Sequence, residues 1–473
     1  MPLSPLRVLF VASECVPFIK TGGLGDVVGA LPLALRALGH DVRVVIPRYR
    51  AVKHIAAEKL PAPFAVPMGP NGRYAAVYRS FVEDTVPVYL IEHDAFFDRD
   101  GLYGDDRGDF SDNLLRFAFL SRAALALGDY LDWPIDLLHL HDWQAALTSV
   151  FASTLTSAPP TVLSIHNLGY QGCFKAADAV DLGIDPGTMA ASGVLQGKFI
   201  NVLRGGLVSA DALTTVSPSY AKEVKTEAGG AGLHDALSGR SVTGILNGID
   251  EARWDPKTDV HLVQNYDAND LRGKAACKLA LQRESGLPER SDVPLLGLVS
   301  RFAEQKGIDV FIETMDELAD EDVQFVVLGS GESSAEEQLA QRGAEREAVA
   351  CTVGFDEPLS HRIEAGCDLF IMPSRYEPCG LNQLYSQRYG TLPIVRAVGG
   401  LRDTVTDGVD GFRFDELSSG ALTAAIRRAV TLFHTGPEAF HSMVQTAMSK
   451  PMGWDVAARE YETLYRQILR QKA

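Results

Sequence analysis

The stretch that most constrains the fold of this chain is a glycine-rich turn, KTGGLGD at Lys20–Asp26. The apolar run before it, Val8–Ala12, is typical of a buried strand, and leucines recur at helical spacing over Leu31–Leu38. A second apolar run follows at Val42–Ile46. A strand, a glycine-rich turn, a helix and another strand form a unit that presents backbone N–H groups to an anion. We therefore predict that this turn binds a phosphorylated, polar ligand.

Short apolar runs separated by helix-like stretches continue along the chain. This alternation predicts parallel sheets covered on both faces. At 473 residues the chain is too long for one ordinary core, so we expect two domains. The predicted fold class is α/β, with two doubly wound Rossmann-like domains. The further strands are expected at Val88–Ile91, Leu137–Leu140, Thr161–Ile165, Ala212–Val216, Leu295–Val299, Gln324–Leu328, Asp368–Met372 and Pro393–Val395.

The domain boundary is expected where the two series of strands are separated by a polar stretch. We place the hinge near Gly248–Pro256, which gives an N-terminal domain at residues 1–248 and a C-terminal domain at 249–453. Residues 454–473 have apolar side chains at helical spacing, so we expect a closing helix that packs back on the N-terminal domain.

The charge of the chain restricts its partners. Asp and Glu (61) outnumber Lys and Arg (44), giving a net charge of −17 that repels nucleic acid and anionic lipid. Six scattered cysteines without a Cys-x-x-Cys pair favour a reducing compartment. We interpret the first apolar run as a strand and not a signal peptide, and no apolar stretch approaches the ~20 residues that span a bilayer. We expect a cytoplasmic protein with no membrane or nucleic-acid partner.

A basic segment in the second half follows a strand and precedes a helix. It is SRFAEQKG at Ser300–Gly307, and it places Arg301 and Lys306 at the carboxyl end of the strand. Two cations in this position suit a diphosphate. The alternative is a solvated basic turn.

A second segment, Arg375–Leu381, also lies between a strand and a helix. Glu377 is a candidate to accept hydrogen bonds from sugar hydroxyls or to stabilise a cationic transition state, while the N–H groups of Gly380 and Leu381 suit a phosphate. The alternative is an electrostatic helix cap. The turn at Gly399–Leu401 is a third candidate for anion binding.

No metal site is predicted. His139 and His141 are two residues apart, as metal ligands often are, but no third ligand is evident. We expect no cofactor.

Six motifs span nearly the whole chain: Lys20–Asp26, His166–Gly172, Asn247–Asp250, Ser300–Gly307, Glu377–Leu381 and Tyr389–Arg396. Taken together, they resemble those of bacterial glycogen synthases and plant starch synthases. The resemblance implies a GT-B glycosyltransferase fold with its site in an interdomain cleft. It also implies retaining transfer of glucose from a nucleotide-glucose, usually ADP-glucose, to the non-reducing 4-hydroxyl of an α-1,4-glucan such as glycogen or a maltooligosaccharide, without a metal.

The same resemblance implies roles for individual residues. Lys20 with Gly22 and Gly23 would meet the diphosphate and glucosyl group, and Arg301 with Lys306 would clamp the diphosphate from the other domain. Cations placed there lower the barrier to separating ADP from glucose.

The remaining residues would surround the sugars and the base. Glu377, with Cys379, Gly380 and Leu381, would hold the glucose hydroxyls. His166 would lie close to the transferred sugar, with Asn247 beside it.

Five further positions complete the expected site. Asp26 and Asp142 would bind ribose or sugar hydroxyls, and Trp143 and Tyr103 would stack on or bond to glucose or acceptor. Phe355 matches a position where the family often has Tyr beside the adenine, and its ring can still stack. Whether retention uses a covalent intermediate at Glu377 or same-face attack stays open.

Two other classes of function were weighed. A nucleotide-cofactor oxidoreductase predicts G-x-G-x-x-G and an acidic residue closing the second strand. Here Gly29 comes one residue late, and the second strand ends in Pro47–Arg48. A non-catalytic glucan-binding protein would leave the pair Arg301 and Lys306 without a purpose.

Tyr385, where the broader glycosyltransferase group carries a second Glu, favours the synthase branch. Within that class, a different donor or acceptor is the main alternative.

Overall fold

The computed structural model describes residues 4–68 and 72–472. The chain divides into two compact units. The first contains the residues up to Val216, Ala221–Asn247 and the chain from Trp454 on, and the second contains Ser217–Tyr220 and Gly248–Gly453. The chain therefore passes between the units near residues 247 and 453, and also makes a brief excursion at 217–220 that the sequence analysis did not predict.

The first unit is built on a large sheet with the strand order β15-β14-β10-β9-β1-β2-β6-β5-β3, and β4 pairs with β5. Neighbouring strands from β15 to β6 are parallel. The bounds are β1 Arg7–Val11, β2 Asp41–Pro47, β3 Glu58–Lys59, β4 Phe64–Val66, β5 Arg73–Val82, β6 Val86–Glu92, β9 Leu137–His141, β10 Thr161–Ile165, β14 Ala212–Thr215 and β15 Val242–Gly244.

One edge of this sheet is antiparallel, and here the prediction of a parallel sheet was wrong. Strand β5 pairs antiparallel with β6, β3 and β4. The β5–β6 turn contains Glu83 and Asp84, both with positive φ, a geometry usually signalled by Asn and Gly. Only Ala75, Val77 and Val82 of Arg73–Val82 are buried, so β5 lacks the continuous burial of a parallel strand that is covered on both faces.

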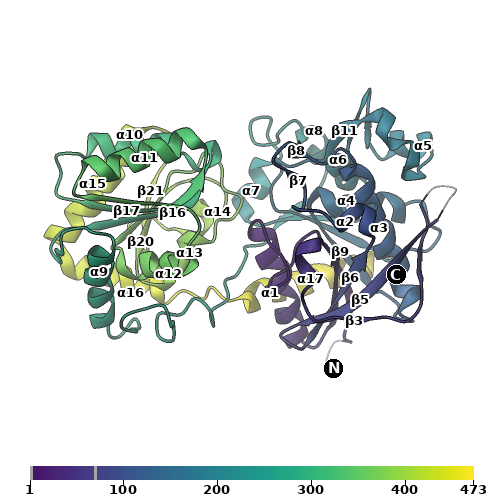
Figure 1. Cartoon of the computed structure of the whole chain (residues 1–473), viewed down its shortest axis with the longest axis horizontal. Helices are drawn as coiled ribbons and strands as arrows, with labels where there is room; N and C mark the ends of the chain where they lie inside the picture. Colours follow the sequence, from purple (N-terminus) through teal and green to yellow (C-terminus); the bar gives the residue numbers. More distant parts are fainter. Residues whose placement is uncertain (1–3, 69–71, 473) are drawn as a thin grey trace. The chain divides into compact units, whose positions relative to one another are not determined.

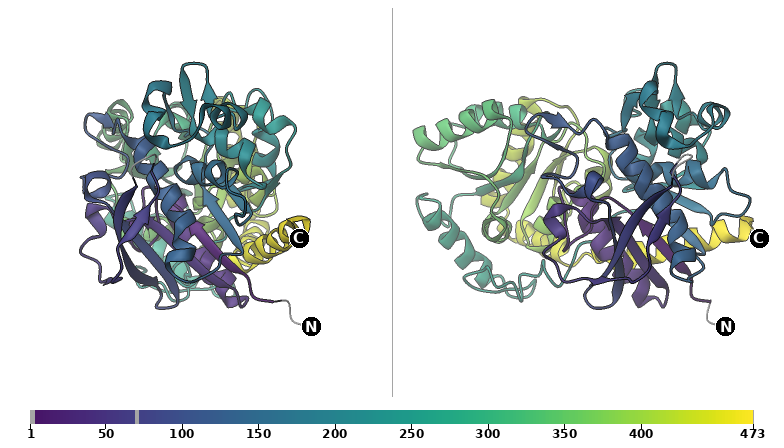
Figure 2. Two further views of the ribbon diagram at one scale, coloured as in Figure 1. Left: turned by 90° about the vertical axis from the view of Figure 1, so that its right-hand side faces the viewer. Right: turned by 45° about the vertical axis from the view of Figure 1, so that its right-hand side comes forward.

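The helices of the first unit form two groups. Helices α1 and α17 pack together, as do α3, α4 and α6 (Figure 1). The end of α17 lies near the start of β1, where the Arg466 guanidinium donates to the Ser4 carbonyl (Figure 2). The bounds are α1 Gly23–Ala37, α2 Asp94–Phe97, α3 Asn113–Tyr130, α4 Asp142–Ala152, α5 Pro186–Ala191, α6 Val202–Ser209, α8 His234–Ser238 and α17 Trp454–Lys472. Helix α7, Pro218–Glu223, begins in the excursion at 217–220 and ends in the first unit.

Two small sheets and two 3-10 helices lie outside the large sheet of this unit. They are built from short strands in long connections that the sequence analysis did not assign. The strands are β7 Gly104–Asp105, β8 Gly108–Asp109, β11 Cys173–Lys175, β12 Leu195–Gln196 and β13 Phe199–Asn201, and the 3-10 helices are η1 Arg50–Val52 and η2 Ala176–Leu182.

The second unit carries a parallel sheet in the order β18-β17-β16-β19-β20-β21. Its two faces bury separate apolar clusters: Leu296 and Leu298 of β16 belong to one, and Leu295 belongs to the other. This alternation is the expected pattern for a strand covered on both sides. The strands are β16 Leu295–Phe302, β17 Gln324–Gly331, β18 Val349–Val353, β19 Leu369–Met372, β20 Leu392–Arg396 and β21 Phe412–Phe414.

The helices of the second unit alternate with its strands, as predicted for a doubly wound domain. They are α9 Arg272–Glu284, α10 Ile308–Glu317, α11 Ser333–Glu345, α12 Glu357–Gly366, α13 Asn382–Arg388, α14 Gly399–Thr404, α15 Ser419–Thr435 and α16 Pro437–Met448, with a 3-10 turn η3 at Glu304–Lys306. None of the helices in the described part of the chain has the length and apolarity that crossing a membrane requires.

Candidate active site

The glycine-rich turn follows β1 and leads into α1. The Lys20 ammonium group donates to the Asp26 carboxylate at 3.0 Å, and both side chains are partly exposed. A side chain at Gly25 would lie 2.6 Å from Cβ of Lys20, and one at Gly29 would lie 2.7 Å from the Val16 carbonyl oxygen. These glycines therefore let the helix approach the turn, which accounts for a glycine spacing that differs from the dinucleotide pattern.

A buried carboxylate that the sequence analysis missed organises this turn. Glu14 accepts hydrogen bonds from the Thr21 N–H at 2.5 Å and the Thr21 hydroxyl at 2.8 Å. Its Oε1 also accepts from the Tyr103 hydroxyl at 2.5 Å. Burial, together with the neighbouring Glu14 charge, holds the pKa of Tyr103 well above its usual range, so this phenol stays a donor. Glu14 thus links Tyr103 to the turn that carries Lys20.

Asp142 and His166 follow the neighbouring strands β9 and β10, as their positions in the sequence predicted. Asp142 has φ of 55° at the start of α4, and its carboxylate accepts from the His166 backbone N–H at 2.7 Å. Burial raises the pKa of the Asp142 carboxyl to about 7. The structure therefore places a carboxyl that titrates near neutrality directly against the backbone of His166.

The Trp143 ring packs inside the first unit. It is 8% exposed, and its neighbours are Phe117 and Phe174 with ring centroids 5.0 and 5.8 Å away. A side chain on Gly172, which has φ of 64°, would lie 2.4 Å from the indole ring. Gly172 therefore lets the loop approach the indole, and little of the Trp143 ring is left open for the sugar stacking that the sequence suggested.

His166 is half-buried, and its Nε2 lies 2.9 Å from Nδ1 of His141. Burial lowers the pKa of His166 to about 4, so the ring is neutral near pH 7. At the end of this unit, the side-chain oxygen of Asn247 is buried without a hydrogen-bond partner among the described residues. His166 therefore keeps part of its ring exposed, and Asn247 keeps an unused hydrogen-bond acceptor. These are the two side chains that were predicted to lie beside the transferred sugar.

In the second unit, Lys306 and Glu377 form an ion pair. The Lys306 ammonium group donates to Oε2 of Glu377 at 2.5 Å, and the Ser374 hydroxyl donates to the same oxygen at 3.0 Å. Glu377 is only 5% exposed, whereas Arg301 is exposed and makes no ion pair within the described residues. The solvated-turn interpretation therefore does not hold for Lys306, and Arg301 stays available for an anion.

The connection between β19 and α13, residues 373–381 and here called the Glu377 loop, contacts the turn that begins α14. Gly400 donates its N–H to the Glu377 carbonyl at 3.0 Å, and a side chain at Gly399 would lie 2.0 Å from that oxygen. The Leu401 N–H bonds to the Val398 carbonyl. The prediction that Gly399–Leu401 binds an anion was therefore wrong: its glycines permit the close approach of two backbones, and two of its N–H groups are already used.

Two N–H groups in the Glu377 loop remain open. Those of Gly380 and Leu381 meet no acceptor in the described ranges. Gly380 has φ of 75°, and a side chain there would lie 2.4 Å from the Gln383 amide oxygen. The buried Cys379 lies within the same loop, and Phe355, after β18, is 85% exposed. The loop thus offers donors, and Phe355 offers a free aromatic face.

The excursion at Ser217–Tyr220 reinforces this loop. The fully buried Ser217 hydroxyl donates to the Pro378 carbonyl at 2.6 Å. The backbone N–H and the hydroxyl of Ser219 donate to the Asp403 carboxylate at 2.7 and 2.6 Å. Because Asp403 lies on α14, this excursion, α14 and the Glu377 loop are joined by hydrogen bonds into one assembly.

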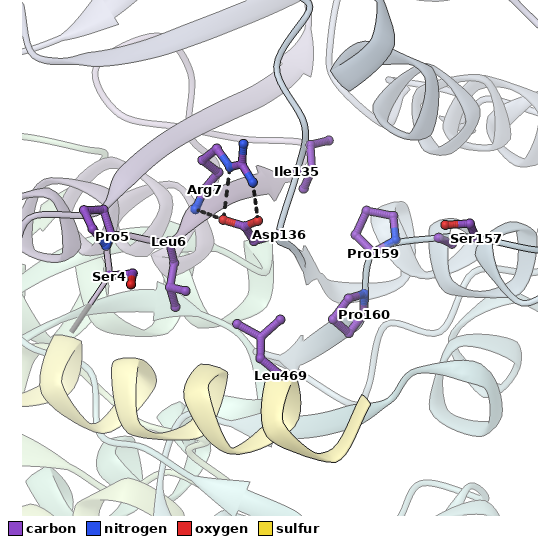
Figure 3. A pocket seen from close by; sticks show the side chains of 11 residues that line it. Ser4, Pro5, Leu6, Arg7, Ile135, Asp136, Ser157, Pro159, Pro160 and Leu469 are labelled. Carbon is purple, nitrogen blue, oxygen red and sulfur yellow. Dashed lines mark hydrogen bonds and ion pairs between the residues drawn. The ribbon is translucent and has the colours of Figure 1, made fainter. Parts of the chain in front are cut away.

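A cavity of about 590 Å³ in the first unit lies at the end of the sheet opposite to the candidate residues (Figure 3). Arg7 begins β1, and Asp136 and Pro160 immediately precede β9 and β10, so the cavity is at the amino ends of the strands. Arg7 and Asp136 bond to each other there. The candidate residues lie at the carboxyl ends, where open α/β sheets bind ligands. Within the described residues, no group of three or more His, Cys, Asp or Glu side chains is arranged to hold a metal ion.

Comparison with known families matches both halves of the chain. Residues 7–239 match the family described as starch synthase catalytic domain, and residues 282–437 match glycosyl transferases group 1. A glycogen synthase of Anaeromyxobacter sp. (strain Fw109-5) is 47% identical over 98% of this chain and 99% of its own length. Glycogen synthase 1 of Geobacter metallireducens is 44% identical over 99% of this chain and 97% of its own length.

Solved structures agree with these matches. The catalytic domain of starch synthase IV from Arabidopsis thaliana, bound to ADP and acarbose, has a TM-score of 0.90 and 33% identity, covering 99% of this chain and all of that one. A sucrose-phosphate synthase from Thermosynechococcus elongatus has a TM-score of 0.63 at 17% identity, covering 98% of this chain and all of its own, which supports the fold alone.

Proposed function

The chain belongs to the family of bacterial glycogen synthases and plant starch synthases, and from this premise we propose that it transfers glucose from ADP-glucose to an α-1,4-glucan. The acceptor is the non-reducing 4-hydroxyl of glycogen or a maltooligosaccharide, the anomeric configuration is retained, and ADP is released. The enzyme is a hexosyltransferase of glycogen biosynthesis. We place it in the cytoplasm, where six cysteines that form no disulfide within the described residues suit a reducing medium.

One observation carries this proposal: the ion pair between Lys306 and the buried Glu377 carboxylate, with Arg301 five residues before Lys306 and without an ion pair to any described residue. Departure of ADP from glucose develops negative charge on the diphosphate. Fixed cations stabilise that charge more strongly in the transition state than in the bound substrate. Lys306 is therefore proposed to contact the leaving diphosphate while it holds Glu377, and Arg301 to contact its other oxygens.

The Glu377 loop is proposed to bind the transferred glucose and the phosphates together. Its buried carboxylate accepts from sugar hydroxyls, and the open N–H groups of Gly380 and Leu381 donate to phosphate oxygens. Cys379 shapes the wall between them. Phe355, with most of its ring exposed, stacks on the adenine base. In this proposal, residues 249–453 form the nucleotide-sugar domain.

Residues 1–248, with the helix at 454–473, are proposed as the glucan-side domain. Lys20, Gly22 and Gly23 contact the diphosphate and glucosyl group, and Asp26 and Asp142 bind hydroxyls. The buried carboxyl of Asp142 has its pKa near 7, so it can serve as a hydrogen-bond donor or acceptor.

The sugars are further contacted by aromatic and amide groups of this domain. His166 and Asn247 contact the transferred glucose, the first as a neutral ring and the second through its unsatisfied oxygen. Tyr103 and the indole N–H of Trp143 contact the acceptor. The net charge of −17 disfavours nucleic acid as a partner.

The test is a coupled assay of ADP release and glucan lengthening. Purified protein is incubated with a maltooligosaccharide and either ADP-glucose or UDP-glucose, and both products are quantified. We expect ADP release and chain lengthening in equal amounts, with ADP-glucose as the preferred donor. A non-catalytic glucan-binding protein would bind the oligosaccharide without lengthening it, and that result would overturn the proposal. Preference for UDP-glucose would overturn only the donor assignment.

A further inference from the structure

Two buried histidines, His139 and His141, form a row with His166, the histidine that is proposed to contact the sugar. His139 and His141 are two residues apart on β9, so their side chains share one face of the sheet. Their ring centroids are 4.3 Å apart, and His141 in turn bonds to His166 of the following strand end. His139 and His141 are fully buried. The row therefore connects the sheet interior to a half-exposed ring.

His139 is fully satisfied inside this row. Its Nε2 lies 2.6 Å from the Ser164 hydroxyl, and its Nδ1 lies 2.7 Å from the Tyr465 hydroxyl of α17. Hydroxyl groups donate and accept equally well, so these partners accommodate either tautomer of His139. His139 therefore has a structural role, because its bond to Tyr465 helps to pack α17 onto the sheet.

His141 differs, because only one of its nitrogens has a partner. Nδ1 faces Nε2 of His166 at 2.9 Å, whereas Nε2 is buried without a hydrogen-bond partner in the described part of the chain. The Phe10 ring lies against it with centroids 5.2 Å apart. Burial holds the pKa of both histidines below its usual value, so each ring carries a single N–H.

A hydrogen bond between two neutral imidazoles has two possible arrangements. In one, the His141 Nδ1–H donates to His166 Nε2, and the unpartnered His141 Nε2 is a bare lone pair. In the other, His166 Nε2–H donates, and the Nε2–H of His141 is buried without an acceptor among the described residues. Orphaned buried N–H groups are rarer in proteins than under-satisfied acceptors. The first arrangement is therefore favoured.

We propose that His141 is a positioning residue that fixes the tautomer of His166, donating from its Nδ1–H to His166 Nε2 so that His166 keeps its own proton on Nδ1. Nδ1 of His166 makes no hydrogen bond within the described residues. His166 then presents a fixed N–H donor, and its basic nitrogen is occupied. It can donate to an oxygen of a bound sugar but cannot act as a general base. This consequence for the sugar rests on the proposed function, whereas the tautomer itself does not.

The tautomer can be measured without substrate. The full chain is labelled with ¹⁵N-histidine, and two-bond ¹H–¹⁵N correlations report which ring nitrogen of each of the 11 histidines carries the proton. The His166 signals are assigned by their loss in His166→Asn. We expect Nδ1–H for His166 at neutral pH. Observation of Nε2–H for His166 in the wild-type protein overturns the proposal, whatever the enzyme proves to catalyse.

Variants then test the effect on activity. His141→Leu removes the donor, and we expect the Nε2–H form of His166 to appear. We expect kcat to fall about 10- to 100-fold, by analogy with the loss seen when the partner that orients a metal-binding histidine is removed. In His141→Asn the amide N–H sits close to the place of Nδ1, so we expect the His166 tautomer and most of the kcat to return. KM for the donor should change less than kcat.

Tyr465→Phe is the matched control, because it removes a buried hydroxyl partner from His139 and leaves the bond between His141 and His166 intact. We expect it to lower stability without changing the His166 tautomer or kcat. Equal loss of kcat in His141→Leu, His141→Asn and Tyr465→Phe would assign the histidine row a purely structural role and overturn the proposal. If His141→Leu does not fold, the wild-type spectrum and His141→Asn still decide.

Discussion

Lys306 and Glu377 are 71 residues apart in sequence, yet the Lys306 ammonium group lies 2.5 Å from the Glu377 carboxylate. The pair forms because Lys306 follows β16 and Glu377 follows β19, and these strands are parallel neighbours. Parallel strands bring their carboxyl ends to one edge of a sheet, so a cation and a carboxylate from distant motifs meet there. The proposed chemistry of the second unit depends on this pair.

Lys306→Ala should abolish most of the catalytic activity while the fold survives. Removal of a positioned electrostatic stabiliser costs about 10²-fold or more in kcat. Ser374 still donates to the Glu377 carboxylate in this variant, so the loop keeps one of its anchors. Steady-state kinetics with circular dichroism measure both effects. Lys257→Ala, which removes an exposed lysine 3.8 Å from Asp267, is the control and should keep wild-type kcat. A kcat of Lys306→Ala near that of the control would exclude the proposed role.

Gly399→Ala should impair both stability and catalysis, whereas Gly408→Ala should affect stability alone. Both glycines have positive φ, so alanine costs about 1–2 kcal/mol at either position. The new methyl group meets nothing within 4 Å at Gly408, but at Gly399 it would lie 2.0 Å from the Glu377 carbonyl. We therefore expect a larger loss of stability and a displaced Glu377 loop only in Gly399→Ala. Denaturant unfolding and kcat distinguish the two, and equal kcat values would contradict this account of the loop.

Ser217→Ala should weaken the support of the Glu377 loop. The substitution leaves the buried Pro378 carbonyl without its donor, which costs about 1–3 kcal/mol in the free energy of unfolding. We expect a several-fold lower kcat as well, because the loop that holds the sugar loses an anchor. Ser121→Ala is matched to it, since the buried Ser121 hydroxyl has no hydrogen-bond partner among the described residues. If the two variants have the same kcat, the excursion at 217–220 does not support the loop.

Much of the fold and of the site could be predicted from the sequence because both depend on local patterns. Apolar runs mark the parallel strands, and the polar residues after them mark the carboxyl ends of the strands, where Lys306 and Glu377 lie in the second unit and Asp142 and His166 lie in the first. Within each unit, the geometry of a parallel sheet is enough to bring such residues close together.

The features that were missed depend on contacts between distant loops. Glu14 and Tyr103 are 89 residues apart, and neither has a neighbour pattern that predicts a bond between them. Ser217 directly follows the strand predicted at Ala212–Val216, and nothing local reveals that it bonds to Pro378, 161 residues away. The error over Gly399 has the same origin, since a glycine that binds an anion and one that admits a second backbone look alike in sequence.

The buried carboxyl of Asp142 should make stability fall as pH rises. Its pKa is about 7 in the folded protein, whereas the ordinary pKa of an aspartate is 3.8. The folded state therefore binds the proton more tightly than the unfolded state. Between about pH 4 and pH 7 the unfolded state therefore gains relative stability, by up to about 4 kcal/mol in total. Asp142→Asn cannot titrate but can still accept from the His166 N–H. Denaturant unfolding should show the wild-type advantage over Asp142→Asn shrinking across this range, and a constant difference would show that Asp142 does not bind its proton more tightly on folding.

The most direct test of the central claim is the structure of the product. A maltooligosaccharide incubated with ADP-glucose and the purified protein is followed by ¹H NMR, which resolves the configuration and linkage of each new glucose. The account predicts new α-1,4 linkages at the non-reducing end, formed in step with released ADP and about 10²-fold or more slowly with Lys306→Ala. Free glucose in place of a longer chain, a β linkage, or no change in the oligosaccharide would contradict it.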